Sequence, residues 1–208
     1  MIEFQNCKLH IQKAKRQFYI EKLCIPQSQS CAIIGGSVTE RRHFLDLFTG
    51  KTFPKVGSLI VRGRCSWDHK SLRYEETMTI GQNIRFFARL AGFQDIDSIP
   101  EKMDALALSN FSFNRAAKIL SPEDKAEISL CLTLLMPFDI FIFDGLPYIA
   151  SEEKRAHYLS KIQSMRSEKQ FVFSVKDFRH VQEYVDCAVV LHENGMDFTQ
   201  DLDAIQDN

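Results

Sequence analysis

The chain has 208 residues, of which 45% are hydrophobic and 25% charged, as is ordinary for a soluble globular protein with a sizeable core. Its formal net charge of −1 gives no electrostatic basis for binding nucleic acid or an anionic membrane. No stretch approaches the ~18 consecutive apolar residues of a membrane span, and the first residues lack the apolar core of a signal peptide. We therefore expect a cytoplasmic protein.

The cysteines and histidines show no metal-ligand pattern. No cysteine belongs to a C-x-x-C pair and their neighbours are mostly apolar, so we expect buried, reduced thiols rather than zinc ligands or disulfides. The six histidines are scattered, without a spacing such as H-E-x-x-H, and no metal site is predicted. The cysteines are Cys7, Cys24, Cys31, Cys65, Cys131 and Cys187.

The first third of the chain is predicted to contain strands and one helix. Short β-like runs lie at residues 2–4, 9–11 and 18–20, and the apolar run 31–34 is typical of a fully buried strand. That run ends at a pair of glycines and leads into a helical pattern, which we expect to stop at Gly50. The predicted order is strand, glycine turn, helix.

The middle of the chain is predicted to be helical. Apolar residues recur at helical spacing from about residue 83 to 90, and Ser98, followed by proline and glutamate, has the pattern of a helix N-cap. A further helix is expected to start at Ser121, again with proline and acidic residues in its first turn. Residues from about 75 to 120 are therefore predicted to form a helical subdomain between two α/β portions.

Buried strands return in the last third of the chain. The apolar run 140–143 ends in Asp144, a polar helical stretch covers 151–167, and further apolar runs lie at 171–173 and 188–191. Buried strands that alternate with helices predict an α/β fold with a mostly parallel sheet and right-handed crossovers. We expect a single domain over residues 1–208.

The order and spacing of these segments resemble an ATP-binding-cassette (ABC) ATPase, most of all the ATP-binding subunits of capsule-polysaccharide exporters. The likeness covers almost the whole chain. It implies a P-loop NTPase fold with a mostly parallel core sheet, an antiparallel β portion and a helical subdomain. The matching segments are residues 25–35, 49–57, 83–90, 138–144 and 184–191.

The phosphate loop of that family reads G-x-x-G-x-G-K-[ST]-[ST], whereas residues 35–43 of this chain read GGSVTERRH. Glycines let backbone N–H groups surround phosphate, the lysine reaches the β/γ oxygens, and a hydroxyl holds Mg²⁺. Only the first glycine matches. Val38 and Glu40 stand at glycine positions, where valine resists a positive φ and a carboxylate repels phosphate.

What remains is a degenerate candidate nucleotide site. Arg41 replaces the lysine, and Arg42 and His43 replace the hydroxyl residues. With Gly35 and Gly36 they form a possible weak anion site at a helix N-terminus, although a solvent-facing helix start is the interpretation that we favour. ATP with Mg²⁺ is thus expected to bind weakly if at all, and no catalytic or metal-binding residue is assigned.

The other family motifs are also altered. Asp144 matches the aspartate that supports Mg²⁺, but Gly145 stands where the resemblance implies the glutamate that polarises the attacking water. Loss of a general base typically lowers the rate by about 10²- to 10⁴-fold. Val175 replaces the γ-phosphate histidine, Glu75 the glutamine of the loop entering the helical lobe, and Ser151 the aspartate of the dimer-contact loop.

The signature-like segment, residues 120–124, reads LSPED where the family has L-S-G-G-Q or Y-S-S-G-M. Ser121 is retained, but Pro122 has no N–H to offer a phosphate and two carboxylates follow it. Because acidic side chains suit the positive end of a helix dipole, we interpret this segment as a self-capped helix start.

The resemblance implies a hydrolysis-deficient subunit that is a structural or regulatory partner of a membrane permease, on the inner face of the cell membrane. It would pair with itself or with an intact ABC ATPase, and no nucleic acid partner is expected. Two alternatives remain. One is an interaction module outside transport, which reuses the nucleotide cleft or the dimer face for a protein or a non-nucleotide ligand; the other is a divergent active ATPase.

Overall fold

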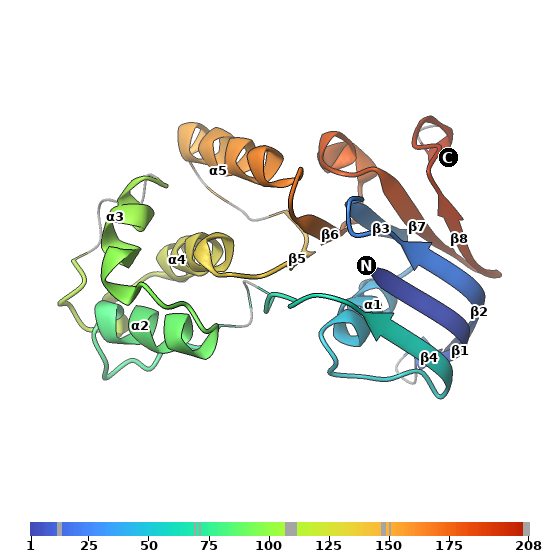
Figure 1. Cartoon of the computed structure of the whole chain (residues 1–208), viewed down its shortest axis with the longest axis horizontal. Coiled ribbons are helices and arrows are strands. Elements are labelled where there is room, and N and C mark those ends of the chain that lie inside the picture. Colours follow the sequence, from blue (N-terminus) through green and yellow to red (C-terminus); the bar gives the residue numbers. More distant parts are fainter. Residues whose placement is uncertain are drawn as a thin grey trace. The chain divides into compact units, whose positions relative to one another are not determined.

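The computed structural model describes residues 1–11, 14–68, 70, 72–106, 112–146, 149 and 151–205. The chain divides into two compact units (Figure 1). Unit 1 comprises residues 1–66, 139–146 and 165–208, and unit 2 comprises residues 67–138 and 147–164. Within the described ranges, no helix combines the length and the apolar character needed to span a bilayer.

Unit 1 begins with a three-stranded antiparallel sheet. Its central strand β1 (Ile2–Ile11) pairs on one side with β2 (Arg16–Ile25) and on the other with β4 (Val56–Val61). The two runs predicted at residues 2–4 and 9–11 thus belong to one strand. A bulge near Asn6, whose φ is 49°, shifts the register of β1 against β4.

The second sheet of unit 1 has the order β5-β6-β3-β7-β8, and its first four strands are parallel. The predicted apolar runs form these four strands, which confirms a mostly parallel core sheet; their side chains are almost all buried, as continuous apolar runs indicate. The bounds are β3 (Cys31–Gly35), β5 (Ile140–Asp144), β6 (Gln170–Ser174), β7 (Cys187–His192) and β8 (Gly195–Thr199). The unpredicted β8 is an antiparallel edge strand that pairs with β7.

Helix α1 (Val38–Phe48) joins the two sheets into one hydrophobic core. The Phe44 ring lies 6.5 Å from the ring centroid of Phe4 and 5.8 Å from that of Phe18, and α1 also contacts β3, β5 and β6. The helix ends where predicted, since Thr49 is its C-cap and Gly50 has a φ of 71°.

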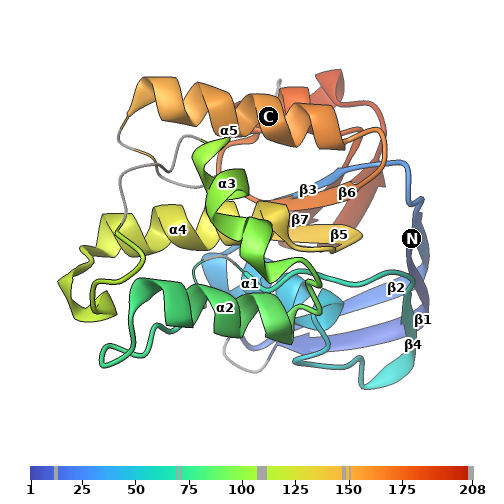
Figure 2. The same cartoon turned by 60° about the vertical axis from the view of Figure 1, so that its left-hand side comes forward.

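Unit 2 is helical, and Figures 1 and 2 both show α2 and α4 side by side. The partly buried Trp67 packs against its core, with a ring centroid 5.0 Å from that of Phe138 and 6.2 Å from that of Phe87. The helices are α2 (Ile80–Leu90), α3 (Ile99–Asp104), α4 (Pro122–Leu135) and α5 (Glu152–Met165), whose last residue lies in unit 1. Short 3₁₀ turns over both units are Ile96–Ser98, Ala117–Ile119, Phe178–His180, Gln182–Tyr184 and Asp203–Ile205.

Two sequence-based details are corrected by the structure. Ser98 precedes α3 as predicted, but its hydroxyl donates to the carbonyl oxygen of Asp95 and makes no capping bond, because a 3₁₀ turn already leads into the helix. Cys24 is exposed on β2, between the buried Leu23 and Ile25, and Cys65 is only partly buried. The other four cysteines are buried, and all six are free thiols.

Candidate functional site

The segment that corresponds to the phosphate loop is a two-residue turn. β3 ends at Gly35, and α1 already begins at Val38, so only Gly36 and Ser37 lie between strand and helix. Gly35 has a φ of 69° and Gly36 a φ of 53°, and a Cβ on Gly35 would collide with the carbonyl oxygen of Leu191 on β7. Both glycines are therefore required by the backbone itself.

The first turn of α1 is closed by its own side chains. The Ser37 hydroxyl accepts a hydrogen bond from the Glu40 N–H at 3.2 Å, and the Glu40 carboxylate accepts one from the Ser37 N–H at 2.6 Å. This reciprocal capping box satisfies two backbone donors that a helix start otherwise offers to a ligand. The valine at the second glycine position is simply helical, and 68% of its surface is exposed.

Glu40 is buried and paired with Arg16 of β2. Only 3% of its side chain is exposed, and its carboxylate lies 2.7 Å from the Arg16 guanidinium. Burial opposes ionisation, but the hydrogen bonds from Ser37 and the charge of Arg16 outweigh it, so the pKa of Glu40 is lowered. The N-terminus of α1 is thus already paired with a negative charge of the chain itself, the Glu40 carboxylate.

Arg16 also ties this turn to the hairpin between β7 and β8. Its guanidinium donates to the carbonyl oxygens of His192 at 2.6 Å and Glu193 at 2.7 Å, and it stacks over the Phe18 ring at 4.9 Å. Sequence reasoning missed Arg16, because nothing in its neighbourhood distinguishes it from other exposed basic residues at a strand end.

Arg41 turns back onto the glycine turn. Its Nη1 donates to the carbonyl oxygens of Gly35 at 2.7 Å and Gly36 at 2.9 Å, and only 6% of the residue is exposed. The prediction of a solvent-facing helix start is therefore wrong for Arg41. Its guanidinium has found acceptors within the chain because the carbonyl oxygens at the end of β3 lie within reach of the first helical turn.

Arg42 and Asp144 are brought together as an ion pair. The Arg42 Nη1 lies 2.7 Å from the Asp144 carboxylate at the end of β5, and the Arg42 Nε lies 3.6 Å from Asp46 one helical turn away. The Ser174 hydroxyl also reaches Asp144, at 3.4 Å. His43 is half-buried, and burial lowers its pKa, so its imidazole is neutral at pH 7.

The signature-like residue Ser121 lies in unit 2 and caps α4. Its hydroxyl accepts from the Asp124 N–H at 3.1 Å, and the Asp124 carboxylate accepts from the Ser121 N–H at 3.2 Å. This is the self-capped helix start that the sequence predicts, with Pro122 in the first turn, where its missing N–H has no cost.

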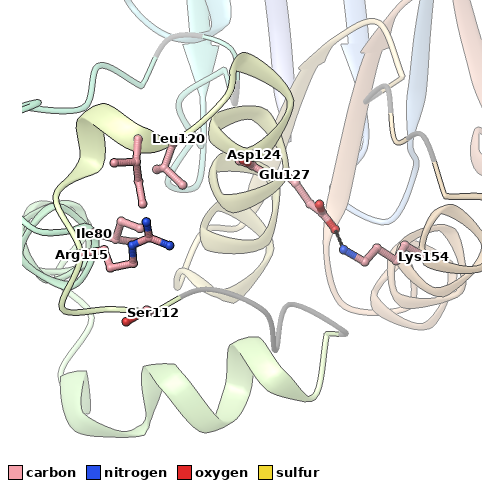
Figure 3. Close-up of a pocket in the computed structure, with 8 residues that line it drawn as sticks. Ile80, Ser112, Arg115, Leu120, Asp124, Glu127 and Lys154 are labelled. Atoms are coloured by element: carbon pink, nitrogen blue, oxygen red, sulfur yellow. Dashed lines mark ion pairs between the residues drawn. The ribbon is translucent and has the colours of Figure 1, made fainter.

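A pocket of about 380 Å³ lies beside this helix start (Figure 3). Arg115 is on one side of it, and an ion pair of 2.8 Å joins Lys154 of α5 to Glu127 of α4 on the other. The acidic side chains Asp124 and Glu127 face the pocket, which gives it a mixed charge instead of the concentrated positive charge that favours phosphate.

Comparison with known proteins identifies the fold. No family model and no curated protein sequence matches the chain. Three similar solved structures are an ATP-binding subunit of an ABC transporter, a dimeric ATP-binding cassette in a post-hydrolysis state with ADP and phosphate, and CbiO1 of Clostridium perfringens, part of the transporter complex CbiONQ.

The first has 14% sequence identity and a TM-score of 0.82, over 100% of this chain and 92% of that one. The second has 12% identity and a TM-score of 0.74, over 96% of this chain and 98% of the other. The third has 12% identity and a TM-score of 0.73, over 99% of this chain and 90% of CbiO1. The chain therefore has the P-loop NTPase fold of ABC-transporter ATP-binding subunits, with a mostly parallel core sheet, an antiparallel β portion and a set of helices.

Proposed function

We propose that this chain is an ABC-fold subunit that does not hydrolyse ATP and serves as a structural or regulatory partner of a membrane permease. One observation carries the proposal. The phosphate-loop segment has closed into a two-residue turn with a self-capped helix, whose N-terminus holds the buried Glu40–Arg16 ion pair.

The residues at this turn do not fit the phosphates of ATP. In a P-loop the residues between the two glycines of G-x-x-x-x-G-K-[ST] form a loop ahead of the helix, and the backbone of that loop surrounds phosphate. Here α1 starts at Val38, and the Glu40 carboxylate and the Ser37 hydroxyl each accept from one backbone N–H at the helix start. An incoming phosphate would meet this negative charge, and Arg41, already bonded to two carbonyl oxygens, is turned away from it.

The residues around Asp144 do not fit Mg²⁺ either. Its carboxylate is paired with Arg42, which stands where a hydroxyl ligand of the metal is expected. Gly145, with a φ of 85°, follows it and supplies no general base. These contacts support loss of hydrolysis, and we derive no catalytic step for this chain.

The proposal also concerns the partner proteins and the cellular location of the chain. One of the similar structures, an inward-facing ABC transporter, has 15% identity to this chain and a TM-score of 0.77, and CbiO1 is part of a transporter complex. By analogy we propose a permease partner on the inner face of the cell membrane, with a second copy or an intact ABC ATPase as dimer partner. The sequence resemblance favours a capsule-polysaccharide exporter.

Calorimetric titration with ATP, with and without Mg²⁺, tests the loss of nucleotide chemistry, and a phosphate-release assay tests turnover. We expect neither Mg²⁺-dependent binding in the micromolar range nor turnover. Glu40→Gly removes the carboxylate at the helix start and is expected to raise ATP affinity, whereas Glu21→Ala, at an exposed glutamate of β2, provides the matched control. Tight Mg²⁺-dependent binding by the unaltered chain would support the divergent active ATPase instead.

Co-expression with the permease encoded nearest to this gene tests the partnership. We expect the two to purify together from detergent-solubilised membranes, with or without added ATP. A chain that stays apart from every such permease, and has no permease gene near its own, would favour the interaction module outside transport.

A further inference from the structure

A small slot lies in unit 2, between α2 and the chain that leads into α3. Its volume is about 150 Å³, which is below the range of about 300–1,000 Å³ typical of sites for larger ligands. An apolar cavity of about this volume accommodates one benzene ring. The slot therefore has room for a single branched or aromatic side chain.

The lining of the slot is mostly apolar. Ile84 of α2 and Ile99 of α3 belong to it and are almost fully buried. The partly buried Ile96, Pro100 and Phe113 supply accessible apolar surface. Water in such a slot finds few hydrogen-bonding partners, so an apolar group that displaces the water is favoured.

Gly81 of α2 leaves one side of the slot open. A Cβ at this position would lie 3.1 Å from the carbonyl oxygen of Phe113, which accepts a hydrogen bond from the Gly81 N–H at 2.8 Å. The Arg85 Nη1 lies 3.7 Å from the position of that Cβ. The guanidinium of Arg85 is thus held close to the bare backbone of Gly81, at the rim of the slot.

The described lining carries one charge of each sign. Arg85 and Asp97 are both exposed, and neither side chain makes an ion pair or a hydrogen bond with any described residue. The neighbouring Asp95 and Lys102, by contrast, pair with each other at 3.5 Å. An unpaired cation and an unpaired anion beside one apolar slot are complementary to a ligand that itself carries both charges.

We propose that this slot binds a small zwitterion with an apolar side chain, of the class of hydrophobic α-amino acids. The side chain enters the slot, the carboxylate pairs with Arg85, and the ammonium group pairs with Asp97. This goes beyond the proposed function, because it gives the chain a ligand other than ATP, held by residues that belong to none of the nucleotide-binding motifs discussed above.

Titration followed by amide NMR tests the ligand class. Leucine and phenylalanine are expected to bind with dissociation constants of about 0.1–5 mM and to shift the amide signals of Gly81 and Ile96. Glycine, which has no side chain to bury, should bind at least about tenfold more weakly than leucine. N-acetyl-leucine lacks the ammonium group and isoamylamine lacks the carboxylate, so each should bind about two- to fivefold more weakly, as expected for the loss of one exposed ion pair.

Matched variants test the two charge contacts. Arg85→Gln should weaken leucine binding about two- to fivefold and leave isoamylamine binding unchanged, with Arg89→Gln, at another exposed arginine of α2, as its control. Asp97→Asn should weaken leucine binding to a similar extent and leave N-acetyl-leucine binding unchanged, with Asp104→Asn, at the exposed last residue of α3, as its control. A residue that only supports the fold would weaken the binding of all ligands alike.

The proposal is overturned if neither leucine nor phenylalanine shows saturable binding up to about 20 mM, or if glycine binds as tightly as leucine. It is also overturned if both single-charge analogues bind as tightly as leucine, which would mark an apolar slot that does not recognise a zwitterion. Equal effects of variants and controls would have the same consequence. The proposed function does not depend on these results, because its loss of nucleotide chemistry is tested by ATP binding and turnover alone.

Discussion

Removing the Glu40 carboxylate is the most informative perturbation of this molecule. In Glu40→Ala, the capping box of α1 is lost, which costs about 1 kcal/mol for a typical cap. Breaking a fully buried ion pair costs about 3–5 kcal/mol. Because a quarter of the Arg16 side chain is exposed and it keeps two carbonyl acceptors, we reduce this contribution to about 1–2 kcal/mol. The expected loss of unfolding free energy is about 2–3 kcal/mol.

Urea unfolding at pH 7 measures this loss, with far-UV circular dichroism for the whole chain and fluorescence of Trp67, the single tryptophan, for unit 2. Glu40→Gln retains an amide oxygen for the cap and removes only the charge, so it should cost about half as much. A double-mutant cycle with Arg16→Met isolates the pair and should give a coupling energy of about 1–2 kcal/mol. A loss below about 0.5 kcal/mol in Glu40→Ala, or no coupling, would refute the assignment of Glu40 as a buried anion that closes the turn.

Three further predictions concern acid, caps and thiols. Because the pKa of Glu40 is lowered in the folded state, its stabilising contribution is complete above its unfolded pKa of about 4.3 and is lost as the pH falls through the folded pKa. Between about pH 5 and 3, the urea midpoint of Glu40→Gln should therefore fall less steeply with pH than that of the unaltered chain. An equal pH dependence of the two midpoints would contradict this. Ser121→Ala should cost about 1 kcal/mol of unfolding free energy in urea, whereas Ser121→Asp should be nearly neutral; equal losses would argue against the cap. Under native conditions Cys24 should react with a maleimide within minutes, whereas Cys31, whose pKa is raised by its neighbour Cys187 and by burial, should react only on unfolding, and peptide mapping distinguishes them.

The buried elements of the fold were predictable because their signal is local. A continuous apolar run such as 140–143 or 171–173 buries all its side chains only in a sheet that is covered on both faces. Ser121 followed by proline and acidic residues is the usual pattern of a helix N-cap. The strands β4 and β8 were missed for the converse reason. Their side chains are largely exposed or half-buried, so neither alternation nor apolar continuity distinguishes them from loops.

The site was predictable as a set of positions but not as a set of contacts. The sequence places Glu40, Arg41 and Arg42 next to one another on a helix, and nothing in it tells that the first is buried against Arg16 while the third reaches Asp144. Such partners lie 24 and 102 residues away along the chain and are chosen by tertiary packing. A solvent-facing helix start was the natural prediction for a basic run, and only the structure corrects it.

The early start of α1 also bears on how such a chain can change over generations. A single change of Val38, Glu40 or Arg41 to the residue of the family motif removes a helical residue, a cap or a carbonyl contact at once. Removal of the Glu40 carboxylate relieves charge repulsion, but we expect a loop that surrounds phosphate to form only when the first turn unwinds, which takes several of these changes together. Each intermediate is therefore expected to be less stable than its parent without gaining hydrolysis, so ordinary selection for stability is enough to keep the turn closed.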